Sequence, residues 1–386
     1  MRVSVVISAL MAVTIGVGAS LAVLLAAAEA VGATPEQTSS WIAVSSLMVA
    51  ITCLVLSAYH RMPVLTAWST PGAALIAATS GLTINQVVGA FFFAAVLMMA
   101  TAGFRGIGVL VERIPTPIAS AMLAGVLFEF VIAPFTHLST LPGLVLPMLI
   151  GFGVLRLFSP IWAVVAVLVL GLALAQVLGL SEPVSGLQAT RIVWIQPEFD
   201  PGVLLGVGLP LYLVTMASQN LPGFAVLKAA GYEPPSRIPL AVTGLASLGG
   251  AGFGAHATNL AAITASLCTG PDAHPDSSKR WLCGPVAAFG YGAVAILGGS
   301  LVALFGAFPL ALIATIAGIA LTGPFIGAIA GGLSVERQRF AAVTTFIVTA
   351  SGVSAWGIGA AFWGLAAGLL VHGLETANAG LRRQAK

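Results

Sequence analysis

The chain has 386 residues, of which 59% are apolar and 7% are charged, and its formal net charge is +3. About a quarter of the residues of a soluble domain are charged, so this composition excludes a water-soluble protein. The basic residues stand singly between long apolar segments, and the positive charge therefore does not indicate nucleic-acid binding.

Fourteen apolar segments follow one another along the chain, and several are shorter than the roughly 20 residues that a plain helix needs to cross a bilayer. The apolar run from Val3 to Ala28 is longer than the roughly 7–15 residues of a signal-peptide core, so we expect a retained first helix. The pattern predicts an all-α polytopic membrane protein without a separate soluble domain. The segments lie at about residues 4–30, 40–58, 64–79, 85–104, 109–134, 142–157, 160–180, 201–228, 236–252, 255–269, 282–306, 308–333, 340–354 and 356–376.

The positions of the basic residues predict the orientation of these segments. If Arg2 is cytoplasmic, alternate connections between segments are cytoplasmic as well. Of the fifteen Lys and Arg residues, Arg191 alone then falls on the outer side. Basic residues gather on the cytoplasmic side of membrane proteins, so we expect both termini to be cytoplasmic.

The longest polar connection, Ser181–Pro201, leaves seven segments on each side. Because seven is odd, the second half enters the membrane in the opposite direction, which is typical of the inverted repeats of secondary transporters. We therefore expect one repeat in residues 1–180 and a second in residues 200–380. A short internal match supports this division, since Ser69–Ala77 aligns with Ala257–Ala265 at an offset of 188 residues.

The third segment combines an extended stretch with a helix start. The run that ends at Trp68 is rich in β-branched and aromatic residues, and Ser69, Thr70, Pro71 and Gly72 follow it. Pro71 suits the first turn of a helix, while Ser69 or Thr70 can cap its free N–H groups. The sequence predicts a short extended stretch that continues into a half-helix.

The tenth segment has a similar order of residues. The glycine-rich run 249–254 precedes His256, and Thr258 and Asn259 offer caps for a helix that continues through Leu260. Two half-helices would bring two N-terminal ends together, and their partial positive charges would form a site for an anion. The alternative is that both segments are ordinary helices kinked by Pro71 and by the glycines.

The eighth segment contains a dense polar run. Gln219 and Asn220 point about 100° apart on a helix, and Pro222 removes a backbone hydrogen bond nearby. We expect at least one of the two amides to face a cavity and to bind the substrate. The alternative is that both serve in polar contacts between helices.

Ionisable residues inside the apolar segments are candidates for proton coupling. Glu129 lies deepest, Glu29 lies near the end of the first segment, and His256 titrates near physiological pH. In each case the alternative is a structural role. The cysteines Cys53, Cys268 and Cys283 have no spacing typical of a disulfide or metal site, and we expect no cofactor.

Four stretches of the chain resemble the benzoate:proton symporter (BenE-type) family of bacteria. The likeness extends from the first segment to Ala361–Gly364 in the last one. It implies the fold of nucleobase and anion transporters, with 14 transmembrane elements in a 7+7 inverted repeat. The stretches that carry it are Met62–Ala74, Val214–Gly223, Asn259–Ala265 and Gly270–Pro275.

The resemblance also implies a core domain from elements 1–4 and 8–11 and a gate domain from elements 5–7 and 12–14. Glu129 would then belong to the gate. Relatives that carry nucleobases have glutamates in the eighth and tenth elements, where this chain has Gln219, Asn220, Thr258 and Asn259. A site without acids suits an anionic substrate, because a carboxylate would repel it.

The expected function is that of a transporter of the bacterial inner membrane that imports benzoate or a similar aromatic carboxylate with a proton, by alternating access. Assembly as a homodimer is left open. The alternatives are a transporter or channel of the same fold for another small anion or a nucleobase-like ring, and, more remotely, an intramembrane enzyme. The expected substrate-binding residues are Trp68, Ser69, Thr70, Gly72, Gln219, Asn220, Phe253, Thr258, Asn259 and Leu260.

Overall fold

Most of the chain forms helices in the computed structural model, which describes residues 2–79, 81–104, 114–183, 186–261, 263–356 and 358–384. Seven helices in these ranges are long and apolar enough to cross a membrane. The chain is therefore a mostly helical, multi-pass membrane protein. The seven are α1 (Val3–Ala30), α2 (Pro35–His60), α4 (Ile84–Gly103), α6 (Thr116–His137), an interrupted helix over Pro201–Ala229, α16 (Leu310–Leu333) and α18 (Ala360–Gln384).

The other helices are shorter or bent. Helices α14 and α15 follow each other with a bend of 58° between them. Each of the fourteen predicted apolar segments contains at least one helix, although residues 109–113 of the fifth lie outside the described residues. The number of crossings and the division into two repeats stay predictions. The remaining helices are α7 (Pro142–Phe158), α8 (Pro160–Val177), α12 (Arg237–Ala251), α14 (Cys283–Ile296), α15 (Gly298–Gly306) and α17 (Arg339–Ala350), with 3-10 turns η3 (Ser277–Leu282) and η4 (Glu336–Gln338).

The interrupted helix contains two wide π-helical turns, each just ahead of a proline. Proline lacks an N–H group, and its ring crowds the carbonyl four residues back, so the helix widens before Pro210 and before Pro222. The second turn presents the amide of Gln219 in the middle of the protein. In order, the parts are α9 (Pro201–Val203), η1 (Leu204–Gly208), α10 (Leu209–Thr215), η2 (Met216–Asn220) and α11 (Leu221–Ala229).

Two short strands pair inside the helical bundle. Strand β1 (Thr66–Trp68) runs antiparallel to β2 (Thr258–Leu260), with Ala67 opposite Asn259. Each strand leads toward a short helix, α3 (Thr70–Ala77) after β1 and α13 (Ile263–Thr269) after β2. The extended stretch and half-helix predicted for the third segment are confirmed.

Side chains satisfy the free edges of this two-stranded ladder. The Leu260 N–H donates to Asn220 Oδ1 at 2.9 Å, and the Thr258 N–H donates to Ser247 Oγ at 2.8 Å. On the other strand, the Thr66 N–H donates to Cys53 Sγ at 3.2 Å. An unsatisfied peptide group in an apolar interior costs several kcal/mol, so these side chains make extended backbone tolerable there.

The predicted start of the tenth-segment helix is wrong. The offset of 188 residues would place Thr258–Leu260 on the first turn of α3, whereas the strands align at an offset of 192, Thr66 with Thr258. The backbone of Thr258–Leu260 is engaged in the ladder with β1, so these residues cannot cap a helix. Helix α13 begins at Ile263 instead.

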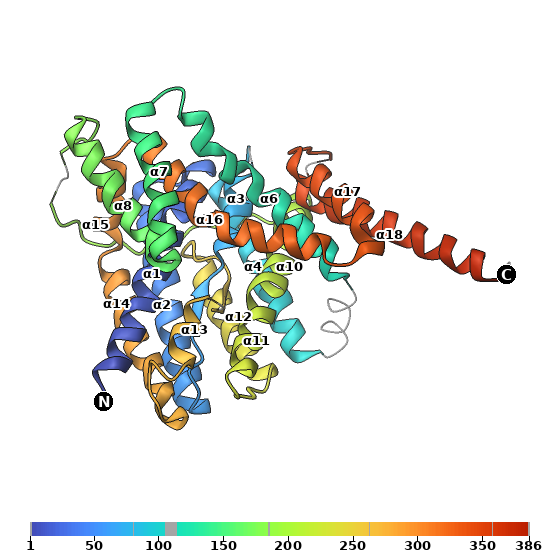
Figure 1. Ribbon diagram of the computed structural model, residues 1–386, viewed down its shortest axis with the longest axis horizontal. Helices are drawn as coiled ribbons and strands as arrows, with labels where there is room; N and C mark the ends of the chain where they lie inside the picture. Colours follow the sequence, from blue (N-terminus) through green and yellow to red (C-terminus); the bar gives the residue numbers. More distant parts are fainter. Residues whose placement is uncertain are drawn as a thin grey trace.

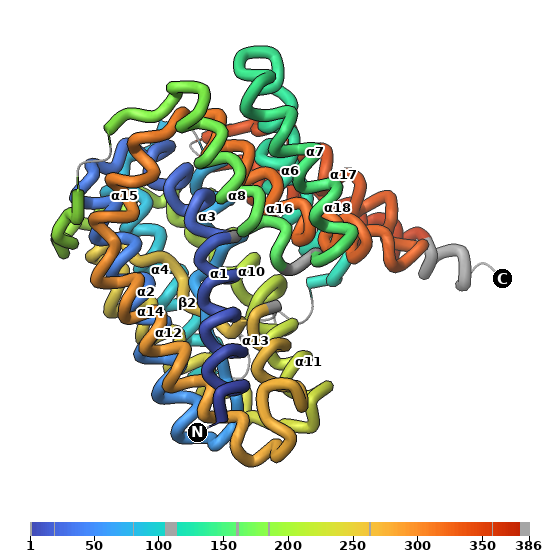
Figure 2. Tube along the Cα trace, turned by 60° about the vertical axis from the view of Figure 1, so that its left-hand side comes forward, coloured from blue at the N-terminus to red at the C-terminus, as the bar shows by residue number. Residues whose placement is uncertain are grey.

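The helices pack in two groups. Helix α2 packs against α12, α14 and α15, while α6 packs against α16, α17 and α18. Helix α1 contacts both groups, through α3, α13 and α14 on one side and α16 and α8 on the other. Figure 1 shows α17 and α18 on the opposite side of the molecule from α1, α2 and α14, and Figure 2 shows α13 beside α1, which it contacts.

Three arginines stabilise the C-terminal ends of helices. Arg237 Nε donates to Ala102 O at 2.9 Å, at the end of α4. Arg280 Nη1 donates to the last residue of α13, and Arg339 Nε donates to Leu333 O, the end of α16. The C-terminal end of a helix carries a partial negative charge, so a cation there is favourable. All three arginines lie on the predicted cytoplasmic side.

Candidate functional site

A cavity of about 130 Å³ lies where β1 meets α3. One water needs about 10–15 Å³ of such space, so the cavity can hold a ligand of several heavy atoms. Seven helices or strands contribute to its wall: α1, β1, α3, η2, α13, α14 and α16. It is lined by Ile15, Gly16, Ser20, Ala67, Trp68, Thr70, Pro71, Gln219, Ala261, Thr264, Tyr291, Ala320 and Pro324.

The N-terminal end of α3 opens toward this cavity. Ser69 caps the helix, because its Oγ accepts the Gly72 N–H at 3.1 Å, and it also accepts a hydrogen bond from Thr215 Oγ1 at 3.0 Å. A side chain at Gly72 would lie 2.5 Å from Leu211 of α10, so glycine permits the close packing of the two helices. The helix start carries a partial positive charge near Thr70, which favours an anion.

Four polar side chains face the cavity without a protein partner. Thr70, Gln219, Thr264 and Tyr291 make no hydrogen bond to another described residue. Their hydroxyl and amide groups are therefore free to donate to a ligand. The described residues of the wall include no Lys, Arg, Asp or Glu, so an anion would be bound by neutral donors and by the helix end.

The rest of the wall is mostly apolar and includes two aromatic rings. Trp68 is 3% exposed, and its Nε1 donates to Ser20 Oγ at 2.8 Å, which holds the indole ring in place. Its ring meets the Tyr291 ring edge to face at 5.9 Å between centroids. A side chain at Gly16 would lie 3.0 Å from the Tyr291 hydroxyl, so glycine leaves room for that group. Such a wall suits an aromatic ring.

Several predicted binding residues support the strands and do not line the cavity. Asn220 is fully buried and holds the edge of β2 through the N–H of Leu260. Asn259 is also fully buried, and its Nδ2 donates to the carbonyl of Leu260 at 2.9 Å. Thr258 pairs with Trp68 across the ladder. In this conformation these three residues position the backbone beside the cavity.

His256 links α2 to Ser69, the cap residue of α3, through two hydrogen bonds. Its Nδ1 accepts a hydrogen bond from Trp41 Nε1 at 2.9 Å. The proton of the neutral ring therefore sits on Nε2, which donates to Ser69 O at 3.0 Å. The ring is completely buried, and these bonds support a structural role next to the cap of α3. Its role in proton coupling stays a prediction.

The other predicted residues lie away from the cavity. Glu29 is exposed at the C-terminal end of α1. Glu129 is exposed on α6 and faces a different cavity. Phe253 packs edge to face on Trp194, with ring centroids 5.3 Å apart, and does not touch the cavity at α3. Its contact with substrate therefore stays a prediction.

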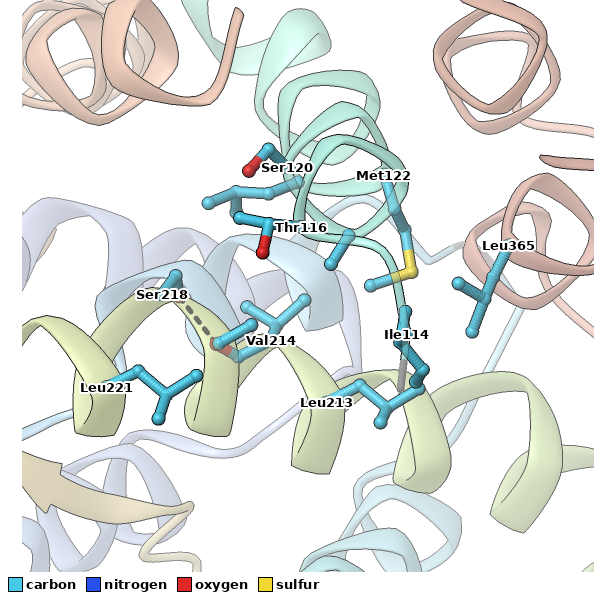
Figure 3. Close-up of a pocket in the computed structure, with 12 residues that line it drawn as sticks. Ile114, Thr116, Ser120, Met122, Leu213, Val214, Ser218, Leu221 and Leu365 are labelled. Carbon is cyan, nitrogen blue, oxygen red and sulfur yellow. Dashed lines mark hydrogen bonds between the residues drawn. The ribbon is translucent and has the colours of Figure 1, made fainter. Parts of the chain in front are cut away.

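Figure 3 shows a further cavity, of about 180 Å³, between α6 and α10–α11. Hydrocarbon side chains such as Met122, Leu213 and Leu365 form most of its wall. The Ser218 hydroxyl in this wall already donates to Val214 O at 2.6 Å. Its described wall has no amide, no charged side chain and no aromatic ring, so this cavity is a poorer site for an aromatic carboxylate than the one at α3, although the N-terminal end of α6 at Thr116 also reaches it.

Sequence reasoning found Trp68, Thr70 and Gln219 but missed other residues of the wall. Ser20, Thr264 and Tyr291 come from segments that read as uniformly apolar. A polar side chain inside each apolar run was the available signal. Among the described residues, no group of His, Cys, Asp and Glu side chains could hold a metal ion.

Comparisons with known proteins identify the family of this chain. The model of a family described as benzoate membrane transport protein matches residues 1–374. The inner membrane protein YdcO of Escherichia coli is 40% identical over 363 residues, covering 93% of this chain and 92% of that protein. The benzoate membrane transport protein of Acinetobacter baylyi is 36% identical over 371 residues, covering 96% and 94%.

Solved structures share the fold at low sequence identity. The transmembrane domain of the cyanobacterial bicarbonate transporter BicA has a TM-score of 0.59 and 16% identity, covering 96% of this chain and 98% of that one. The murine anion transporter Slc26a9 in its inward-facing state has a TM-score of 0.64 and 14% identity, covering 98% and 69%. At these identities the likeness shows the fold alone.

Proposed function

The chain belongs to the benzoate membrane transport protein family, and we propose that it imports benzoate or a similar aromatic carboxylate together with a proton, by alternating access. The carboxylate sits at the N-terminal end of α3, and the ring lies against Trp68 and Tyr291. The Acinetobacter baylyi relative, which matches nearly the whole chain, is named a benzoate membrane transport protein, which favours transport over enzymatic activity. No step of this function requires a cofactor.

One observation carries the proposal. The cavity combines donors on Thr70, Gln219, Thr264 and Tyr291, which have no hydrogen-bond partner among the described residues, with an aromatic wall that includes Trp68. A carboxylate gains charge-assisted hydrogen bonds from the donors, each about twice as strong as a neutral one. Burial of the aromatic ring against the apolar wall also stabilises the bound substrate. A substrate that is anionic at one end and aromatic at the other fits both parts.

Alternating access requires two bodies that move relative to each other, and we propose the two-domain division for this chain. Elements 1–4 and 8–11 would form the core, and elements 5–7 and 12–14 the gate, in a 7+7 inverted repeat. The two packing groups of helices support this division. Two further cavities lie between the groups: the one in Figure 3 near the start of α6, and another near Glu129 farther along it.

With both termini cytoplasmic, the cavity near the start of α6 faces the cytoplasm and the one near Glu129 faces outward. The substrate cavity, which Thr70 and Gln219 line, then lies between these two cavities. This orientation rests on the distribution of basic residues. It is supported by Arg237, Arg280 and Arg339, which all cap helix ends on the predicted inner side.

The competing proposal is transport of another small anion with the same fold. The fold neighbours described as bicarbonate and anion transporters motivate it. An inorganic anion would use the donors but would gain nothing from Trp68 and the apolar wall. The aromatic part of the cavity therefore favours benzoate.

Counterflow in proteoliposomes separates the two proposals. Vesicles loaded with unlabelled benzoate take up labelled benzoate from outside, and bicarbonate, uracil or sulfate is added as a competitor. We expect unlabelled benzoate to compete and the other three to leave uptake unchanged. Competition by bicarbonate at equal concentration, or the absence of benzoate exchange above that of protein-free vesicles, would contradict the proposed substrate.

A further inference from the structure

A second cavity, of about 270 Å³, lies at the other end of α3. Leu75, Ala78 and Thr79 from the C-terminal end of α3 form one side, and Glu129 of α6 forms the other. The start of α18 and the end of α17 close it. Helix α3 has eight residues, so the two cavities are separated by about 12 Å along its axis.

Glu129 is the ionisable residue of this cavity. Its side chain is exposed, and it forms no hydrogen bond or ion pair with any other described residue. Among the described residues, no other acid or base lines the cavity. A carboxylate inside an apolar helix of a membrane protein is costly, so Glu129 is a candidate for a functional role.

The elements packed against α6 bring no partner charge to Glu129. Helices α3 and α16 and the turn η2 contain no ionisable side chain, and Tyr212 of α10 is hydrogen-bonded to Thr101. Arg156 of α7 lines a separate cavity with Pro134.

The charged residues of the last two helices lie at a distance from the cavity. Arg339 stands ten residues before Thr349 on α17, about 15 Å along the helix, and Thr349 lines the cavity. On α18, His372 and Glu375 lie about 16–21 Å beyond Ala361. Within the described chain, protonation is therefore the available way to neutralise Glu129 when it is taken out of water.

The dipole of α3 gives its two ends opposite preferences. The N-terminal end, at Thr70, favours the substrate anion, and the C-terminal end, at Ala78, carries a partial negative charge. A second anion is disfavoured near that end. One short helix thus separates an anion site from a proton site.

Resting on the proposed function, we infer that Glu129 binds the co-transported proton in a cavity separate from the benzoate site. The proton passes from water in the cavity to a carboxylate oxygen and leaves by the reverse step, so no covalent bond between heavy atoms changes. To close the outer cavity, α6 must approach α3, which desolvates Glu129. Burying the ionised carboxylate without a partner costs several kcal/mol, so closure follows protonation.

The test compares wild type with Glu129→Gln, which mimics the protonated side chain, and with Glu29→Gln as the matched control. Two rates are measured in proteoliposomes: uptake of labelled benzoate driven by an inward pH gradient, and counterflow at equal pH. Protein-free vesicles set the baseline, because neutral benzoic acid crosses bilayers unaided. We expect Glu129→Gln to lose gradient-driven uptake above this baseline and to keep counterflow.

The outcomes distinguish failure of the proposed function from failure of the assignment to Glu129. If wild type shows counterflow but no gradient-driven uptake, proton coupling itself is wrong, and the role of Glu129 falls with it. If wild type is coupled and Glu129→Gln remains coupled, or if Glu29→Gln loses coupling equally, the assignment to Glu129 is overturned while the proposed function stands. Loss of counterflow in folded Glu129→Gln would place this residue in substrate binding and also overturn the assignment.

Discussion

Replacement of Gln219 by leucine separates a binding residue from its structural neighbour. The Gln219 amide faces the cavity at α3 without a partner among the described residues, so Gln219→Leu removes a donor to the substrate and leaves no protein group unpaired. A hydrogen bond to a charged group contributes about 1.5–3 kcal/mol, and each 1.4 kcal/mol is a factor of about ten. We therefore expect the Kd for benzoate to rise about 10- to 100-fold.

The matched variant is Asn220→Leu, one residue along the same turn. It leaves the buried N–H of Leu260 without an acceptor, which costs about 1–3 kcal/mol of stability. Calorimetric titration with benzoate and thermal unfolding of both purified variants check the pair. Gln219→Leu is expected to weaken binding at an unchanged Tm, and Asn220→Leu to lower Tm. Wild-type affinity in Gln219→Leu would refute the assignment of the cavity.

Three further predictions concern the same cavity. Gly72→Ala places a methyl group 2.5 Å from Leu211, and thermal unfolding should show a loss of about 1–3 kcal/mol; an unchanged Tm would mean that α3 and α10 are not packed so closely. Trp68→Phe keeps a ring but loses the N–H bond to Ser20, so benzoate affinity measured by titration should fall by less than in Gln219→Leu, and a larger loss would contradict the role of Trp68 as an apolar wall. Benzoate at about 100 times its Kd should stabilise the folded protein by about 2.7 kcal/mol, read as a rise in Tm that uracil does not produce.

Local residue patterns predicted the half-helix at α3 correctly. Ser69 and Pro71 supply a cap and a preformed first turn, and both effects act within four residues of the chain. The same reasoning misplaced the start of α13, because Thr258–Leu260 forms a strand only through its pairing with Thr66–Trp68. That pairing joins residues almost 200 positions apart and is invisible in either segment alone.

The cavity wall was predictable only in part for a similar reason. Gln219 stood out as an amide in a polar run, whereas Ser20 and Tyr291 stand in long apolar segments with only apolar or glycine residues directly beside them. Their importance arises from the packing of α1 and α14 around Trp68. The amide of Asn220 looked equivalent to that of Gln219, and the π-helical turn η2 decides which of the two faces the cavity.

The most direct test of the account is the initial rate of labelled benzoate uptake into proteoliposomes under an inward pH gradient. Protein-free vesicles and vesicles with Gln219→Leu, each at the same lipid concentration, serve as the baselines. The account predicts uptake by wild type well above both baselines, and a protonophore should abolish the difference. Wild-type uptake equal to that of protein-free vesicles, or uptake that the protonophore leaves unchanged, would contradict proton-coupled import of benzoate.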